Sequence, residues 1–396
     1  MAHELEEPDF ALQEYPGREL HDALRRHRER HPVTPARFLG QPAFVITGHA
    51  ALRRAFADDV RFPGHRMYQA SFEGAIGESF ISMGDDARHR VYRKLATPTF
   101  RSRAVAAYED ESLVGIAREL VDKLSERIIA GETVDLVSGF TASFPYRVIT
   151  RLLGLPRDRE NEFHAWAVAL LGFRDDPARG IEARNELTRY LAPIVEERRA
   201  NPQEDVISGL VQAEIEGRKL SNEEIFSHIR LLFPTGGETT YGTLGNLIST
   251  LFSENLWSEI AGAPSHIPQV IDEALRFESS IAVLPRMSAS CETEFEGVTI
   301  PPDSWLMFAV AGANRDPSVF ESPDTFDIGR TSGDMLTFGR GKKSCPGMHF
   351  AKRNMIVALQ VLLERLPALE LVDTNAAIPR RSVLRAPDAL RVRARR

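Results

Sequence analysis

Cys345 lies in a short loop whose composition suits metal binding. Residues 338–347 read FGRGKKSCPG, with three glycines, a proline and three cations around the thiol. Most lone cysteines are small buried hydrophobic residues, but glycines let successive backbone N–H groups turn toward a sulfur atom, which favours the thiolate. A thiolate serves as a nucleophile or as a metal ligand. Because no base lies nearby in the sequence, we favour a metal whose other ligands come from a macrocycle.

A second group of polar residues interrupts the apolar stripe of the longest predicted helix, residues 221–252. Within FPTGGETT, Pro234 removes a backbone donor and Gly236 leaves the buried face without a side chain. Glu238 and Thr239 are polar where packing alone favours leucine or alanine. Either one long helix presents a bare position to a flat ligand here, or two helices meet at a Pro-Gly turn.

Two further pairs have the spacing of one helical turn. Glu273 and Arg276 form an E-x-x-R pair, and His89 and Arg93 form an H-x-x-x-R pair. Each pair taken alone is most often an exposed helix surface. They gain meaning only together with the cysteine loop.

Helices must position most of these residues. Helical apolar spacing covers residues 104–131, 140–153, 182–199 and 207–216. Near the N-terminus, ARFLG-QP-AFVITG alternates apolar residues about a short turn and predicts a hairpin, while TEFEGVTI and SWLMFAVAG predict further strands. The sequence therefore predicts a mainly α fold with small β-sheets. We expect one domain of residues 1–396, with residues 1–31 as an N-terminal lead-in segment that belongs to it.

Composition limits the setting in which this chain works. Of 396 residues, 43% are hydrophobic and 27% are charged, and no run of 18 apolar residues is present. The acidic N-terminus lacks the basic start and apolar stretch of a signal peptide. A formal net charge of −7 argues against nucleic acid as the main partner. We expect a cytoplasmic monomer that binds neither nucleic acid nor a membrane.

The cysteine loop resembles the F-x-x-G-x-x-x-C-x-G haem-binding signature of the cytochrome P450 superfamily. Three other motifs occur in the order of that family: H-x-x-x-R at His89, A/G-G-x-D/E-T at residues 235–239, and E-x-x-R at Glu273. The resemblance covers nearly the whole chain from about residue 32. It implies the cytochrome P450 fold and the soluble, bacterial type of this family.

The resemblance also implies roles for individual residues. Cys345 is the expected axial thiolate of a non-covalent haem b, and Glu273 and Arg276 are expected to form a buried ion pair with Arg330 as third member. The haem propionates need cations, because an unpaired buried carboxylate is costly. The residues assigned to haem binding are His89, Arg93, Gly236, Arg286, Phe338, Gly339, Lys343 and Gly347. Those assigned to a substrate pocket are Leu232, Phe233, Ile281, Val283 and Leu284.

Four positions depart from the family pattern. Met335 stands where many members have a histidine, and Lys343 stands where the usual residue is histidine or arginine. In the family these residues help to bind the propionates. Thr325 replaces the arginine of a P-x-R-F motif, which is why Arg330 is assigned as the third member. Thr235 is bulkier than the usual alanine or glycine and is expected to narrow the groove.

The implied activity is a monooxygenase that uses O2 to hydroxylate or epoxidise a mostly apolar small molecule. Thr239 and Glu238 are the expected catalytic residues, because they would organise water and deliver protons. Thr239 alternatively bonds only to the carbonyl of Thr235, which bends a helix. Peroxygenase or isomerase activity on the same fold, and a non-catalytic haem sensor, are the other interpretations.

Electrons are expected from a separate protein. The short stretch after Cys345 leaves no room for a fused reductase, and no G-x-G-x-x-G fingerprint is present. We expect NAD(P)H to act through a ferredoxin reductase and an acidic ferredoxin. The ferredoxin would dock near Cys345 on a run of cations: Arg340, Lys342, Lys343, Lys352 and Arg353.

Overall fold

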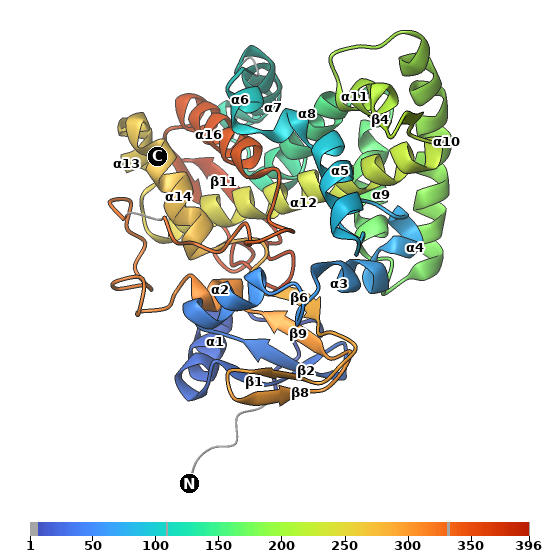
Figure 1. Cartoon of the computed structure of the whole chain (residues 1–396). Coiled ribbons are helices and arrows are strands. Elements are labelled where there is room, and N and C mark those ends of the chain that lie inside the picture. Colours follow the sequence, from blue (N-terminus) through green and yellow to red (C-terminus); the bar gives the residue numbers. More distant parts are fainter. Residues whose placement is uncertain (1–6, 108–109, 331–332, 396) are drawn as a thin grey trace.

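Helices make up most of the molecule, and a small sheet forms one end of it (Figure 1). The structure is a computed structural model and describes residues 7–107, 110–330 and 333–395. The mainly α architecture with small sheets is the one that the sequence predicts.

The helices follow one another in this order: α1 (Arg18–Arg30), α2 (His49–Ala57), α3 (Gly64–Ser71), α4 (Glu73–Ile76), α5 (Asp86–Ala96), α6 (Ser102–Ala107), α7 (Asp110–Ile129), α8 (Phe144–Leu153), α9 (Glu160–Leu171), α10 (Pro177–Ala200), α11 (Val206–Gln212), α12 (Asn222–Ser253), α13 (Trp257–Gly262), α14 (Ile267–Phe277), α15 (Val310–Ala313) and α16 (Met348–Arg365). Short 3₁₀ turns cover Pro98–Phe100 and Pro264–His266, and a π-helical turn covers Val137–Thr141.

The main sheet has the strand order β1-β2-β9-β6. Strands β1 (Val33–Phe38) and β2 (Gln41–Ile46) form the antiparallel hairpin predicted from alternating apolar residues. Strand β9 (Trp305–Phe308) runs parallel to β2, and β6 (Leu284–Met287) is antiparallel to β9. Three smaller sheets pair β7 (Thr293–Phe295) with β8 (Val298–Ile300), β4 (Glu214–Ile215) with β5 (Arg218–Lys219), and β11 (Arg391–Ala394) with both β10 (Leu369–Leu371) and β3 (Val134–Asp135).

Helix α12 crosses the helical part of the molecule (Figure 1) and packs against α8, α9, α14 and α16. Its first turn is closed by a capping box. The Glu224 N–H donates to the Ser221 hydroxyl at 3.3 Å, and the Ser221 N–H donates to the Glu224 carboxylate at 2.8 Å. The helix continues unbroken through Pro234. The alternative of two helices joined at a Pro-Gly turn is therefore wrong.

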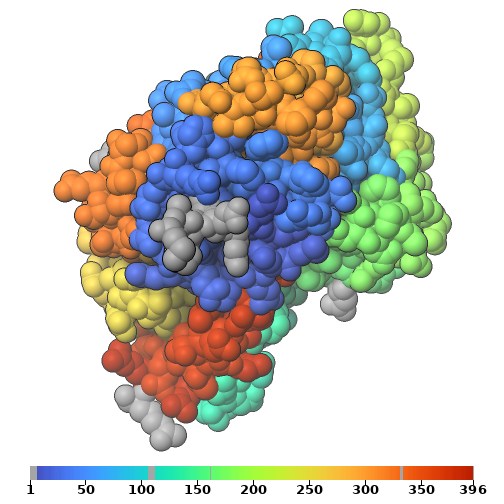
Figure 2. Space-filling model, turned by 90° about the horizontal axis from the view of Figure 1, so that it is seen from below, coloured from blue at the N-terminus to red at the C-terminus, as the bar shows by residue number. Residues whose placement is uncertain are grey.

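The N-terminal and C-terminal segments cover one face together. In the view from below (Figure 2), residues near the N-terminus in blue lie between the orange segment near residue 300 and the red C-terminal residues. Phe10 and Tyr15 are buried in the sheet core, and the Gly17 N–H donates to the carbonyl of Pro379 at 2.9 Å. The part of the lead-in segment that the structure describes thus packs against the sheet.

Candidate haem-thiolate site

The loop that carries Cys345 needs glycine at two positions. Gly339 and Gly341 have φ angles of 64° and 74°, a conformation that other residues rarely adopt. A Cβ atom on Gly341 would also lie 2.7 Å from the carbonyl oxygen of Phe56. The Cys345 N–H donates to the carbonyl of Phe338 at 2.9 Å and closes the loop around the thiol.

The Cys345 thiol is surrounded by protein but is not packed tightly against it. The side chain keeps accessible surface, while burial raises the pKa of the thiol. The Gly347 N–H and the Arg93 guanidinium act in the opposite direction and favour the thiolate. A metal cation on the sulfur would displace the proton outright.

Four basic side chains gather beside this loop: His89 and Arg93 from α5, Arg286 from β6, and Lys343 from the loop itself. Burial, together with the charges of Lys343 and Arg93, lowers the pKa of His89 to about 4. Burial also lowers the pKa of Lys343 to about 8. Within the described residues, none of the four forms an ion pair with a carboxylate.

The hydrogen bonds of these cations go to backbone carbonyls. Arg93 donates to two carbonyls of the loop at 2.6 and 3.1 Å, and Lys343 donates to two carbonyls of residues 80–83, both at 2.9 Å. Arg286 donates to the carbonyl of the preceding residue at 3.1 Å. The Nε2 atom of His89 is buried without a partner. Buried polar atoms are almost always paired, so this set indicates a site for an anionic group.

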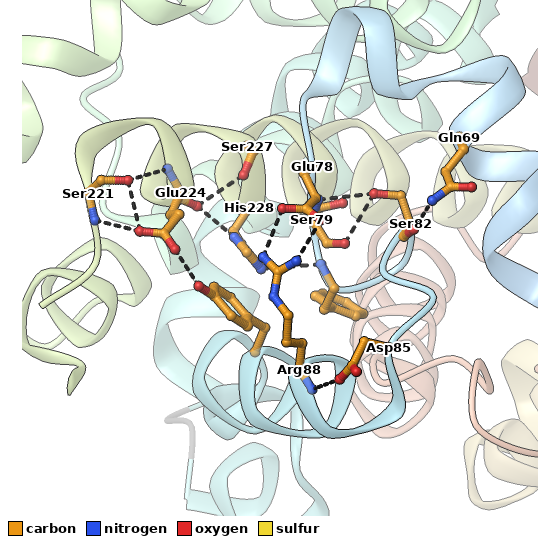
Figure 3. Close-up of polar contacts among 12 residues, drawn as sticks. Gln69, Glu78, Ser79, Ser82, Asp85, Arg88, Ser221, Glu224, Ser227 and His228 are labelled. Atoms are coloured by element: carbon orange, nitrogen blue, oxygen red, sulfur yellow. Dashed lines mark hydrogen bonds and ion pairs between the residues drawn. The ribbon is translucent and has the colours of Figure 1, made fainter. Parts of the chain in front are cut away.

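The segment before α5 is held between α5 and α12 (Figure 3). Arg88 of α5 donates to the carboxylate of Glu78 at 2.9 and 3.1 Å. The hydroxyl of Tyr92, one turn further along α5, donates to Glu224 at the start of α12. These contacts fix the orientation of α5 and hence the positions of its two basic residues near the loop.

His228 joins α12 to the same segment (Figure 3). Its Nδ1–H donates to the carbonyl of Glu224 at 2.6 Å, and its Nε2 accepts from the N–H of Phe80 at 3.3 Å. Burial lowers the pKa of His228, which suits a neutral imidazole that donates and accepts at once. The carbonyl of Phe80 accepts from Lys343. Phe80 is therefore bonded to α12 through its N–H and to the cysteine loop through its carbonyl.

The middle of α12 has one face that is incompletely packed. Thr235, Gly236 and Thr239 are half-buried in a helix whose flanking residues are mostly buried. The Thr239 hydroxyl donates to the carbonyl of Thr235 at 2.8 Å, so the helix-bonded arrangement is present, and its oxygen can still accept. A Cβ on Gly236 would lie 3.0 Å from the side chain of Ile149 on α8. Close helix packing thus accounts for Gly236, and its contact with haem stays a prediction.

Glu238 points to α8 and α9. The hydroxyl of Tyr146 on α8 donates to its Oε2 at 2.7 Å, and the Nε2 of His164 on α9 lies 3.6 Å from the same oxygen. Burial and the charge of Glu238 raise the pKa of Tyr146 well above its usual value, so the phenol remains a donor. Sequence reasoning missed Tyr146 and His164, because neither belongs to a motif.

The ion pair of α14 is fully buried. Glu273 and Arg276 are joined by two hydrogen bonds of 2.6 and 2.8 Å, and their side chains are 1% and 0% exposed. The Arg330 Nε donates to Glu273 at 3.2 Å, so the expected third partner is in place. Arg276 also donates to three carbonyls of residues 314–325, including that of Thr325 at 3.2 Å. This group ties α14 to the chain that leads to the cysteine loop.

Two of the predicted pocket residues belong to the core. Phe233 is fully buried against the rings of α8 and α9 residues, with centroid distances of 5.7 and 5.5 Å. Val283 is fully buried in the cluster beneath the main sheet. The pocket prediction for these two is corrected, because core packing accounts for both. Leu232 is also buried, whereas Ile281 and Leu284 are half-buried and can border a ligand.

The cations predicted to dock a ferredoxin are largely engaged within the protein. Lys342 pairs with Asp86 at 2.6 Å, Lys352 with Asp272 at 2.6 Å, and Arg340 lies 3.5 Å from an aspartate of its own loop. Lys343 points inward to backbone carbonyls. The run of positive charge seen in the sequence is therefore a weaker surface feature than expected.

Together these residues define the class of protein. A thiol in a glycine-shaped loop, unpaired cations and an orphaned imidazole nitrogen fit a haem with its sulfur ligand and two propionates. Among the described residues, no cluster of three or more His, Cys, Asp or Glu could hold a metal ion instead. The site is that of a haem-thiolate protein.

Comparison with known proteins defines the family. Residues 10–165 and 266–390 match the Cytochrome P450 family. The chain is 33% identical to 6-deoxyerythronolide B hydroxylase of Saccharopolyspora erythraea, over 92% of this chain and 94% of that protein. It is 31% identical to cyclomarin C epoxidase of Salinispora arenicola, over 89% and 90% of the two chains. The solved structure of the bacillaene polyketide synthase cytochrome P450 PksS of Bacillus subtilis superposes with a TM-score of 0.84, 26% identity and coverage of 95% and 97%.

The chain belongs to the cytochrome P450 family, and its fold is the cytochrome P450 fold. It is a haem-thiolate monooxygenase that uses O2, as the hydroxylases and epoxidase among its relatives are. Through the described part of the chain, no helix is long and apolar enough to span a bilayer.

Proposed function

We propose that this monooxygenase hydroxylates or epoxidises a bulky, mostly apolar organic molecule. The observation that carries the proposal is the half-buried pair Thr235 and Thr239, one turn apart on α12, in an otherwise well-packed helix. The half-buried apolar side chains of Ile281 and Leu284 supply further contact area. Two relatives are named as a 6-deoxyerythronolide B hydroxylase and a cyclomarin C epoxidase, which favours these two types of reaction.

Glu238 and Thr239 are the proposed proton-delivering residues. Haem, when bound, supplies the activation of O2. One oxygen atom enters the substrate and the other leaves as water, so each turnover consumes two electrons and two protons. Glu238 is a buried carboxylate that can carry a proton, and the Thr239 oxygen can accept a hydrogen bond from water. The two residues are neighbours in the sequence of α12: Thr239 lies on its half-buried face, whereas the Glu238 carboxylate points to α8 and α9.

The proposed electron source is NAD(P)H, through a reductase and an acidic ferredoxin. Arg90 and Lys94 on the outer face of α5 are exposed and have no ion-pair partner in the described chain. Helix α5 lies against the cysteine loop, because its Arg93 donates to two loop carbonyls. We therefore move the proposed docking surface from the paired cations of the loop to Arg90 and Lys94.

The ligand assignment has a direct spectroscopic test. The reduced protein with carbon monoxide should absorb at the wavelength typical of a thiolate-ligated haem, and Cys345→Ala should lose this band. The other cysteine, Cys291, is exposed in a loop, so Cys291→Ala is the matched control and should keep it. An unchanged spectrum in Cys345→Ala would refute the assignment.

The substrate class is tested by a defined panel. We would score 6-deoxyerythronolide B, myristic acid, testosterone, limonene and naphthalene by the low-to-high-spin change of the haem, and then by product analysis. We expect 6-deoxyerythronolide B to give the largest spin-state change. If only naphthalene, the smallest probe, is bound and converted, the proposed bulky substrate is wrong.

The proton role is tested by Thr239→Ala with the best panel compound. The variant should bind haem and consume NADH, but it should divert electrons from product to hydrogen peroxide. Thr243→Ala is the control, because Thr243 lies one turn further along α12 and its hydroxyl makes the same helix bond, to the carbonyl of Thr239 at 2.8 Å. Wild-type coupling of NADH to product in Thr239→Ala would mean that its hydroxyl only bonds the helix.

A further inference from the structure

Glu238 lies between the interior of the protein and a histidine that faces solvent. The residue is 9% exposed, whereas the side chain of His164 on α9 is 48% exposed. Their Oε2 and Nε2 atoms are 3.6 Å apart, slightly beyond hydrogen-bond distance. A small side-chain rotation would bring them within it. His164 is therefore a solvent-exposed basic side chain next to this carboxylate.

Apart from His164, no basic group competes for this carboxylate. Within the described residues, no lysine or arginine lies within ion-pair distance of Glu238. Tyr146 donates to the same oxygen at 2.7 Å, and its raised pKa keeps the phenol protonated. Tyr241 faces the ring of His164 from α12 at 6.2 Å, and burial raises its pKa as well. Both phenols can hold the two residues in place, but neither readily releases a proton near neutral pH.

An imidazole is the side chain best suited to exchange protons with water near neutral pH. A carboxylate two torsions from the backbone can turn between two faces of its helix. Glu238 can thus accept a proton on the side of α8 and α9, and release it on the side of Thr239, its neighbour in the sequence. This route needs no movement of the backbone.

We propose that His164 is the solvent-facing member of a proton relay that recharges Glu238 during turnover. This inference rests on the proposed function, in which Glu238 delivers protons. Each proton passes from water to the imidazole, then to the carboxylate, then to water beside Thr239, and His164 and Glu238 return to their starting states. Two protons cross for each molecule of substrate oxidised. Tyr146 acts as a positioning residue that holds the carboxylate toward His164.

The test compares two ways of driving the same product. With O2 and NADH, the reaction takes up two electrons and two protons. With hydrogen peroxide, the oxidant already carries both, and the substrate plus peroxide gives product plus water. A relay residue should matter for the first reaction only, whereas a structural residue should matter for both. The best panel compound serves as the substrate.

His164→Gln should lower O2-driven product formation roughly 10-fold, below the usual range for a proton-transfer group because water partly replaces the ring. It should also raise the solvent deuterium isotope effect on that reaction. Peroxide-driven product formation and the carbon monoxide spectrum should match the wild type. His266→Gln, at an exposed histidine of a 3₁₀ turn, is the matched control and should change neither. His164→Asn is the second variant if the glutamine variant folds poorly.

An unchanged O2-driven rate in His164→Gln would overturn the relay, as would an equal loss in both reactions. Glu238→Gln separates this failure from that of the proposed function. If Glu238→Gln slows the O2-driven reaction and His164→Gln does not, only the relay is wrong. If Glu238→Gln keeps the wild-type O2-driven rate, the proton role of Glu238 itself is wrong. If the wild type converts no panel compound, the proposed substrate class fails, and the isotope effect is then measured on O2-dependent NADH oxidation.

Discussion

Two groups of charged side chains support the cysteine loop, and they differ in how their charges are neutralised. In the first, Glu273 is bonded to Arg276 and Arg330, and Arg276 has carbonyl partners as well. In the second, within the described residues, Arg286 and Lys343 donate hydrogen bonds to carbonyls and pair with no carboxylate, and the His89 Nε2 has no partner. The first group is complete within the protein. The second is completed only by an anionic ligand.

This difference separates stability from binding. Removing one member of a complete group strands the other charge in the core. Removing a cation from an incomplete group should leave the haem-free protein as stable or more stable, and should weaken only haem binding. In the haem-free protein, substitutions in the first group should therefore lower the free energy of unfolding, and substitutions in the second group should keep or raise it.

The largest effect is expected at the complete group. Arg276→Ala or Glu273→Ala should lower the free energy of unfolding by about 3–5 kcal/mol, because the remaining charge is stranded in a site with almost no solvent access. Urea unfolding and haem content after purification measure this loss. Glu273→Leu combined with Arg276→Met should lose less than either alanine variant, since it leaves only Arg330 without its carboxylate, and Arg330 keeps its hydrogen bonds to backbone carbonyls. Normal stability of Arg276→Ala would contradict the comparison.

A second buried group, whose carboxylate Glu278 is paired within the protein, sharpens the comparison through pH. His21 on α1 lies 2.9 Å from Glu278, which also accepts from the buried Arg385. Burial, and then the charge of Arg315, lower the pKa of His21 to about 4. The imidazole is therefore neutral at pH 7 and donates a hydrogen bond to Glu278 rather than forming a true ion pair.

The sign of the pH effect follows from this pKa. In the unfolded chain His21 binds a proton near its ordinary value of about 6.5, so the unfolded state holds more protons between that pH and about 4. The contribution of His21 to the free energy of unfolding should be constant above about pH 6.5 and fall by up to about 3 kcal/mol toward pH 4. Urea midpoints across this range measure the fall. His21→Asn should remove only its own share of the fall, since His27 and His89 also have pKa values lowered to about 4 by burial. The exposed His266→Asn should not reduce the fall, and equal slopes in both variants would remove His21 as a contributor.

The sequence predicts the parts of the molecule that local patterns control. The hairpin of β1 and β2, the capped start of α12 and the glycine loop at Cys345 each depend on residues close together in the chain. The Glu273–Arg276 pair is one helical turn long, so its geometry is also local. Patterns of this kind are readable because the elements form largely from their own residues.

Contacts between distant elements could not be predicted in this way. Tyr146 and Glu238 are 92 residues apart and meet only because α8 packs against α12. Phe233 and Val283 are apolar residues beside site motifs, but the direction of each side chain depends on the neighbouring helix or strand. The pairing of Lys342 with Asp86 likewise requires α5 to lie against the cysteine loop. A sequence pattern shows which residue types occur, but not which neighbouring helix or strand each side chain will contact.

A smaller effect is expected at the incomplete group of Arg286, Lys343 and His89, where a substitution should weaken haem binding without lowering the stability of the haem-free protein. Arg286→Met should weaken haem binding about 10- to 100-fold, the loss of roughly 1.5–3 kcal/mol for a charge-assisted hydrogen bond. The haem-free chain should unfold at the same or a higher urea concentration, because a buried cation without a carboxylate partner has been removed. Haem transfer to apomyoglobin measures the first quantity. Exposed Arg54→Met is the control and should change neither; a large loss of stability in haem-free Arg286→Met would break the comparison.

The smallest effect is expected at the surface, where paired and unpaired cations can also be told apart. Arg90 and Lys94 on α5 are exposed without ion-pair partners in the described chain, whereas Lys342 is held by Asp86. Reduction by an acidic ferredoxin should slow as ionic strength rises from about 0.01 to 0.15 M, because the screening length shrinks from roughly 30 to 8 Å. Arg90→Ala with Lys94→Ala should flatten this dependence, as measured by stopped-flow reduction under carbon monoxide. Arg179→Ala with Arg189→Ala removes two exposed cations of α10 and should leave the dependence unchanged. Equal salt dependence in wild type and the α5 variant would place the electron donor elsewhere, since an encounter guided by these two charges must weaken when they are removed.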